Sequence, residues 1–267
     1  MISRLDRETL RRQFRSAQPF PHVVIDNLLV PGAAEEVAAA FPSFERAREL
    51  GFAFNFVNEQ RKIQVTDATR FPEPVRRLQN AISSPEFLAD LEFITGIARL
   101  LADEQLEGGG MHLTGGGGRL DVHVDFNVLE KRKLFRRLNI LLYLNPIWQA
   151  EWGGQIELWD RDVRNCLLRS PPVLNRCLIF ETSDISYHGV AAVSAPADVV
   201  RQSFAAYYYT QEAPPNWDGA SHSTIFKARP DEKLRKFVQM PIEQFRRGLA
   251  ERIGKSKKWV KARIGLS

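Results

Sequence analysis

Three residues that suit a metal-binding site occur at two places along the chain. His123 and Asp125 are separated by one residue, and His188 follows within the segment Ser186-Tyr187-His188-Gly189-Val190. Side chains at positions i and i+2 of a strand point to the same face, so the first imidazole and carboxylate could lie side by side. Two histidines and one carboxylate are the ligand set that suits non-haem Fe(II) in oxygenases. The first pair alone is a weak signal, because a buried core histidine followed by a turn carboxylate has the same pattern.

A second group of residues could bind a carboxylate close to such a metal. Arg201 and Ser203 share one face of a predicted strand downstream of His188, and a guanidinium binds a carboxylate through two parallel hydrogen bonds. A buried arginine without a partner would be costly, although an arginine on an edge strand could face solvent. Asn139 and Tyr143 share a face of an earlier strand. Tyr143 could donate to the same carboxylate or be a core tyrosine, and Asn139 could orient a ligand or bond across strands.

The elements that must position these residues are short strands in the second half of the chain. Strands of regular spacing with turn residues between them predict a sandwich or jelly roll, whose barrel brings distant residues to one end. The expected strands in this part are residues 119–125, 136–144, 155–159, 163–168, 174–180, 186–190 and 199–209. The first third is expected to supply helical support and a few strands. Its helices are expected near the N-terminus and at residues 33–40, 72–82 and 85–94, with strands at 20–26, 52–57 and 61–66.

Two glycine clusters, Gly108–Gly110 and Gly115–Gly118, flank a short predicted strand at residues 111–113. They could be mistaken for a phosphate-binding loop. Dinucleotide-binding and P-loop signatures require defined glycine spacing and a following helix, and this segment has neither. We therefore expect the glycines to form flexible turns at the mouth of a barrel.

The overall composition is that of a soluble globular protein. Of 267 residues, 44% are hydrophobic and 26% charged, and no apolar run approaches the roughly 18 residues that a membrane span needs. The arginine-rich N-terminus lacks the apolar segment of a signal peptide. Cys166 and Cys177 are too few for a disulfide framework, so we expect two free thiols and a cytoplasmic location.

The net charge of +5 is unevenly distributed. Residues 227–267 contain 13 Lys/Arg against 4 Asp/Glu, a net charge of +9, which leaves −4 for residues 1–226. We therefore expect a main domain at 1–226, with its core at 105–212, and a basic helical extension at 227–267. Such a charge run is more often a solvated helix face than a contact with nucleic acid or an anionic membrane surface.

Taken together, five motifs resemble the Fe(II)- and 2-oxoglutarate-dependent dioxygenase superfamily, and their order and spacing resemble its prolyl 4-hydroxylase-like branch. The resemblance covers roughly residues 19–210, and each motif is weak by itself. The motifs are His123-Val124-Asp125-Phe126-Asn127, Leu142-Tyr143-Leu144-Asn145 with Trp148, Gly153-Gly154-Gln155-Ile156-Glu157-Leu158, Tyr187-His188-Gly189-Val190 and Arg201-Gln202-Ser203.

This resemblance implies a double-stranded β-helix, that is, a β-rich α+β jelly-roll core with N-terminal helices and a C-terminal basic helical tail. It implies Fe(II) bound by His123, Asp125 and His188. It also implies 2-oxoglutarate bound by Arg201 and Tyr143, with Ser203 and Asn139 nearby. The implied reaction uses O₂, releases succinate and CO₂ and hydroxylates an unactivated C–H bond, with ascorbate as an optional reductant. Family members that halogenate replace the triad carboxylate by a small residue, so Asp125 implies hydroxylation.

The substrate is the least determined part of this prediction. A proline or amino-acid-type residue is expected, whether free, peptidyl or carrier-bound. A basic rim, from Lys62 and the Lys131-Arg132-Lys133 turn, would favour an acidic substrate, although that turn could equally be solvated. Many prolyl hydroxylases place a tyrosine before the first iron ligand; here His112, Thr114 and Asn139 are the candidates for the metal-proximal carboxylate. The alternative function is a catalytically inactive jelly-roll binding or sensor protein.

Overall fold

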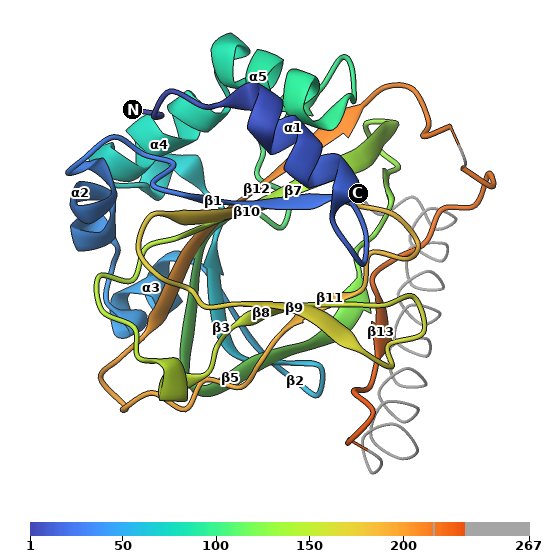
Figure 1. The fold of residues 1–267 in the computed structure, drawn as a ribbon. Coiled ribbons are helices and arrows are strands. Elements are labelled where there is room, and N and C mark those ends of the chain that lie inside the picture. Colours follow the sequence, from blue (N-terminus) through green and yellow to red (C-terminus); the bar gives the residue numbers. More distant parts are fainter. Residues whose placement is uncertain (216, 233–267) are drawn as a thin grey trace, which may run out of the picture.

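The computed structural model describes residues 1–215 and 217–232, and its elements are labelled in Figure 1. The helices are α1 (Arg7–Ser16), α2 (Ala33–Ala40), α3 (Phe44–Leu50), α4 (Glu73–Ile82) and α5 (Pro85–Thr95), with 3₁₀ turns η1 (Ala68–Arg70) and η2 (Ala150–Trp152). The strands are β1 (His22–Asp26), β2 (Phe52–Phe56), β3 (Glu59–Val65), β4 (Leu101–Ala102), β5 (Gly110–Val124), β6 (Val128–Leu129), β7 (Leu134–Tyr143), β8 (Ile156–Trp159), β9 (Cys166–Ser170), β10 (Arg176–Glu181), β11 (His188–Val190), β12 (Arg201–Thr210) and β13 (Ile225–Lys227).

The strands form one curled antiparallel sheet in the order β1-β10-β7-β12-β5-β11-β8-β9. The long strand β5 turns the sheet back on itself. Its first part pairs with β12, and its second part pairs with β11. Two facing layers result, β1-β10-β7-β12 above and β11-β8-β9 below (Figure 1). The expected jelly-roll fold is confirmed, and a strand lies at each position expected between residues 119 and 209. Most ends differ by a few residues, but β5 begins at Gly110, because the segments expected at 111–113 and 119–125 form one strand.

Alternate side chains of the upper-layer strands point to opposite faces of the layer, one toward the helix-packed core and the other toward the space between the two layers. On β7, Leu138, Ile140 and Leu142 pack into the core that also contains Phe14 of α1 and Leu91 of α5. Helices α1, α4 and α5 lie over this outer face of the layer, whereas α3 lies beside β3 (Figure 1). The alternate positions of β7 point between the two layers, where the candidate site residues lie. Helix packing and site formation therefore use opposite faces of the same strands.

Local signals account for the helices that support this layer. Ser84 caps α5 by accepting a hydrogen bond from the backbone N–H of Phe87, and Pro85 occupies the first helical position. Gly96 ends the helix in the left-handed region, with φ of 78°. Helix α3 was not expected from the sequence, although Ser43 caps it in the same way through the N–H of Arg46.

The glycines of the second cluster do not form a turn, so this prediction was wrong. Residues 115–118 lie inside β5, in a bulge: Arg119 pairs with Gln60 and Thr114 with Lys62, which leaves four glycines opposite the single residue Arg61. A Cβ at Gly118 would lie 2.5 Å from the Thr114 side chain and 2.8 Å from the Gly115 carbonyl oxygen. Glycine is required because the bulged backbone folds against itself.

A second bulge changes which side chains of β7 point inward. Tyr208 of β12 pairs with Leu138, but Tyr209 pairs with Arg136, so Arg137 is an extra residue in β7. An extra residue reverses the alternation beyond it. Arg136 therefore points inward like Asn139, although the two are three residues apart.

The expected domain boundary between residues 226 and 227 falls inside β13, which pairs with the end of β5. Arg229, beyond that boundary, ion-pairs with Glu157 at 2.8 Å. The remaining prediction for the C-terminus, a basic helix, concerns residues 233–267, which lie outside the described residues.

Cys166 and Cys177 are both free, as expected. Within the described ranges, every helix is too short or too polar for a membrane span.

Candidate metal centre

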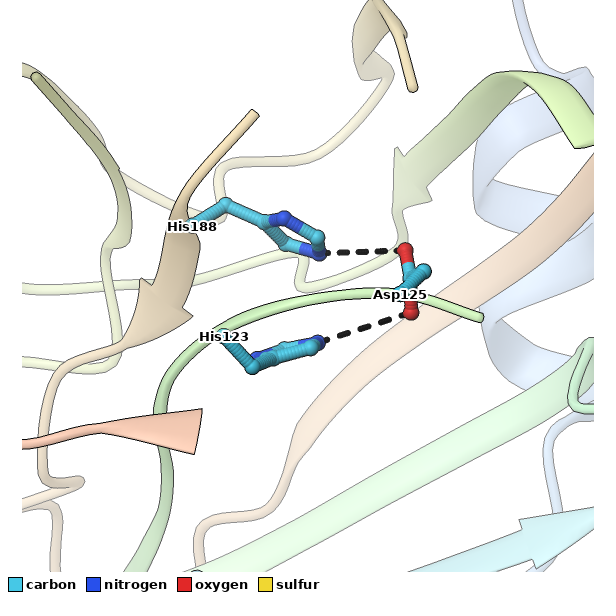
Figure 2. A group of neighbouring side chains, drawn as sticks. All are labelled: His123, Asp125 and His188. Atoms are coloured by element: carbon cyan, nitrogen blue, oxygen red, sulfur yellow. Dashed lines mark ion pairs between the residues drawn. The ribbon is translucent and has the colours of Figure 1, made fainter. Parts of the chain in front are cut away.

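Two histidines and one aspartate converge between the layers of the sheet. His123 lies in β5 and His188 in β11, where the two residues pair directly across the ladder. Asp125 follows the last residue of β5. Its Oδ1 lies 3.6 Å from Nε2 of His123, and its Oδ2 lies 3.5 Å from Nε2 of His188 (Figure 2). One ligand atom from each residue falls within 4.8 Å of the other two, a spacing that can hold a metal ion.

Backbone hydrogen bonds determine which imidazole nitrogens face this centre. Nδ1 of His123 lies 2.9 Å from the carbonyl oxygen of Asp121, and Nδ1 of His188 lies 2.9 Å from that of Ser186. A carbonyl only accepts, so each Nδ1 carries the proton and donates it. Both Nε2 atoms then present lone pairs to the carboxylate of Asp125. Three acceptors facing one another at this distance are stabilised by a cation between them, which is the arrangement of a metal site.

The surroundings of His188 and Asp125 favour a neutral imidazole and a charged carboxylate. Burial, with the neighbouring His123, lowers the pKa of His188 to about 3. Burial is the largest effect on Asp125 and raises its pKa, but Arg136 and the two imidazoles together outweigh burial and hold that pKa well below its usual range. Phe226 packs on the His123 ring at 5.3 Å and Phe180 on the His188 ring at 4.7 Å. His188 and Asp125 are thus ready to bind a metal without first losing protons.

Arg201 and Ser203 lie on the inner face of β12, where Thr114 and His112 of β5 are their cross-strand partners. The Arg201 guanidinium is 4% exposed, and its Nε donates to the carbonyl oxygen of Gly154 at 2.7 Å. Its NH1 lies 3.4 Å from the Ser203 hydroxyl. The other guanidinium donors form a buried positive end to the space between the layers, which suits one carboxylate of a dicarboxylate ligand.

Tyr143 lies beside this guanidinium, with Arg201 Cζ 5.1 Å from its ring centroid. Its hydroxyl is fully buried and lacks a hydrogen-bond partner of good geometry among the described residues. Burial raises its pKa to about 12, so the group is a donor over the whole physiological range. A buried hydroxyl without a partner costs stability, and a carboxylate bound by Arg201 would satisfy it. The residues present therefore fit 2-oxoglutarate.

A cavity of about 310 Å³ joins the triad to this positive end. Ligand pockets begin near this size. Leu141 and Ile156 give its inner part an apolar wall, while Phe54, Lys62 and Phe226 lie at other parts of its lining. Lys62 is paired with Glu59 at 2.7 Å. The cavity thus contains the Arg201 guanidinium, which suits an anionic ligand, and the triad, which suits a metal. The rest of its lining is aromatic and charged.

Other predicted residues lie elsewhere or have partners that were not foreseen. The Lys131-Arg132-Lys133 turn borders a different hollow, and Arg132 pairs with Asp103 at 2.6 Å. The amide of Asn139 is bonded to Asp125 and Arg136. His112 lies next to Gln64 and the carbonyl oxygen of Gly108. The sequence reasoning missed Arg136, because simple alternation from Asn139 points to Arg137 instead.

Comparison with known proteins agrees with this geometry. Residues 109–209, which run from the start of β5 to the end of β12, match the family described as the 2OG-Fe(II) oxygenase superfamily. Over these residues the chain is similar to that superfamily. Prolyl 3-hydroxylase OGFOD1 of Mus musculus is 31% identical over 78 residues, which are 28% of this chain. The same match spans 14% of the mouse protein.

Two solved prolyl hydroxylases share the fold of this chain. The enzyme of Trichoplax adhaerens, in complex with a hypoxia inducible factor oxygen degradation domain peptide, has a TM-score of 0.54 and 18% identity. The alignment covers 77% of this chain and 91% of that one. The prolyl-4-hydroxylase of Pseudomonas putida has a TM-score of 0.52 and 16% identity, with coverage of 76% and 99%. At these identities the likeness concerns the fold, and function has to be inferred from the site.

Proposed function

We propose that this chain is an Fe(II)- and 2-oxoglutarate-dependent hydroxylase. The observation that carries the proposal is the convergence of two imidazole nitrogens and one carboxylate on a cavity that a buried arginine also lines. The Tyr143 hydroxyl, which lacks a hydrogen-bond partner of good geometry among the described residues, lies beside that arginine. The first group supplies the ligand set for iron, and the second supplies donors for the far carboxylate of 2-oxoglutarate. When bound, the iron and cosubstrate supply the oxidising chemistry.

The chain's own residues hold the reactants and exclude water. His123, Asp125 and His188 would hold the metal and leave adjacent coordination positions for the cosubstrate and O₂. Arg201 and Tyr143 would fix the distal carboxylate, with Ser203 beside the guanidinium. Leu141 and Ile156 line the cavity and keep it apolar. Holding reactants in a fixed geometry in a dry cavity is the main contribution of the protein.

We propose an amino-acid-type substrate, with proline, free or peptidyl, as the first candidate. The relatives support this choice, since three of them bear the name prolyl hydroxylase. Aromatic rings at Phe54, Phe126 and Tyr207 line the same cavity and suit a flat apolar ring. Lys62 is paired with Glu59, but the lining as a whole is positive, because its basic side chains (Lys62, Arg119, Arg136 and Arg201) outnumber its carboxylates (Glu59 and Asp125).

The test is formation of succinate from 2-oxoglutarate with Fe(II) and ascorbate, in the presence of free proline, prolyl peptides or other amino acids. We expect substrate-stimulated succinate release that His123→Ala and Arg201→Ala abolish. Lys131→Ala, at an exposed position outside the cavity, is the control and should leave turnover unchanged. If the wild-type protein binds neither Mn(II) nor 2-oxoglutarate, the proposal is wrong. Binding without turnover on any of the substrates would favour a sensor protein.

A further inference from the structure

Each oxygen of the Asp125 carboxylate faces one imidazole of the triad, but only Oδ2 has further partners. Asn139 donates a hydrogen bond from Nδ2 to Oδ2 at 2.7 Å, and Arg136 forms an ion pair with the same oxygen through NH2 at 3.1 Å. Oδ1 is directed toward Nε2 of His123 at 3.6 Å. The two oxygens of the carboxylate are therefore not equivalent, because only Oδ2 accepts the hydrogen bond of Asn139 and lies against the charge of Arg136.

The orientation of the Asn139 amide follows from its second contact. Arg136 Nε lies 2.9 Å from Asn139 Oδ1. An arginine nitrogen only donates, so the atom that receives it must be the amide oxygen, and the amide nitrogen must face Asp125. Arg136 thus acts on the carboxylate twice, by its own charge and by fixing the amide that donates to Oδ2.

Arg136 itself is held rigidly. It is 3% exposed, and its guanidinium lies 3.6 Å from the ring centroid of Tyr207 and 4.8 Å from that of Phe126. Stacking on an aromatic face suits the planar guanidinium and leaves its edge donors free for polar contacts. The bulge at Arg137 is what brings this side chain inward. Bulges that re-aim a side chain are frequent beside active sites.

We propose that Arg136 and Asn139 are positioning residues that make Asp125 bind the metal through Oδ1 alone. The proposal rests on the function proposed above and goes further, because it says which oxygen binds and why. A carboxylate free at both oxygens can occupy two coordination positions of a metal. Holding Oδ2 keeps one of those positions open for the chelating end of 2-oxoglutarate. Partners that orient a metal ligand in this way commonly affect binding about tenfold or more.

The test compares Mn(II) binding and 2-oxoglutarate binding in the full chain. Arg136→Met keeps an unbranched side chain between the two rings and removes the donors, and Asn139→Ala removes the amide. We expect both variants to keep Mn(II) affinity, while the affinity of the Mn(II)-loaded protein for 2-oxoglutarate falls about tenfold or more. Crystal structures with Mn(II) should show one Asp125 oxygen on the metal in the wild type and both in the variants. Arg136→Lys, which retains a charge and donors, should restore part of the lost affinity.

Arg137→Met is the matched control, because Arg137 is the adjacent buried arginine of the same strand and pairs with Glu181 instead. It should change neither binding constant. Unchanged 2-oxoglutarate affinity in Arg136→Met and Asn139→Ala would overturn the proposal. So would a joint loss of Mn(II) binding, 2-oxoglutarate binding and thermal stability in both, since that is the result of a merely structural role. A wild-type protein that binds no Mn(II) would instead refute the proposed function.

Discussion

His188 lies directly opposite His123 in the β5–β11 ladder, and the two imidazole rings are 4.3 Å apart at their centroids. Their separation is set by backbone pairing and by the carbonyl partners of both Nδ1 atoms. The sheet therefore holds the two imidazoles in place before a metal binds. Metal binding then does not have to supply the free energy of ordering them.

Replacing one of these imidazoles should remove the metal site without unfolding the protein. We expect His188→Ala to lower Mn(II) affinity by at least about tenfold, since one of three ligands is lost. Titration calorimetry measures the affinity, and circular dichroism checks the fold. His222→Ala is the control, because His222 pairs with Asp184 outside the triad. Equal losses in both variants would contradict the assignment of His188.

Tyr143→Phe should have opposite effects on stability and on cosubstrate binding. The hydroxyl is buried with no good partner among the described residues, so its removal should stabilise the cosubstrate-free protein by about 1 kcal/mol. The same change removes a donor proposed for 2-oxoglutarate and should weaken its binding to the Mn(II)-loaded protein. Urea unfolding and calorimetry measure the two effects. A variant that is less stable and binds 2-oxoglutarate normally would show that Tyr143 is an ordinary core residue.

His112 should make the protein less stable in mild acid. Burial, with help from the charge of Lys62, holds its pKa well below 6.5, so it stays neutral in the folded state while the unfolded chain takes up a proton. The contribution of His112 to the free energy of unfolding is fully present above the pKa that the histidine has in the unfolded chain. As pH falls below that pKa, the contribution is lost with a slope of about 1.4 kcal/mol per pH unit. Urea unfolding from about pH 7 to about pH 5 should give a smaller slope for His112→Gln. Identical slopes would mean that His112 protonates equally in both states.

Arg229 should be needed to keep β13 on the sheet. Besides its ion pair with Glu157, its NH2 donates to the carbonyl oxygens of Leu120 and Val190. Arg229→Met would leave Glu157 with Arg169 at 3.4 Å and the Trp159 indole N–H at 3.3 Å, and should cost about 3 kcal/mol of unfolding free energy. Lys227→Met, at the last residue of β13, is the control for the loss of a positive charge. Equal stability of the two variants would argue against an anchoring role.

The sequence by itself determined the fold and the residue types of the site. Short strand-like segments at regular spacing, separated by turn residues, predicted the strands between residues 119 and 209. The spacing of His123 and Asp125 predicted that they lie together, and the structure places them 3.6 Å apart. The i, i+2 rule likewise put Arg201 and Ser203 on one face. These inferences are local, and local geometry follows from the chain alone.

Only the tertiary structure decided the features that depend on strand register. The extra residue Arg137 turns Arg136 inward, and four glycines form a bulge opposite Arg61 instead of a turn. β13 crosses the expected boundary at residues 226 and 227 because it pairs with β5, a strand 100 residues earlier in the chain. A bulge is visible only when the partner strand is known, since it is a mismatch between two strands. The contact between Arg136 and Asp125 therefore could not be predicted from the residue pattern of a single strand.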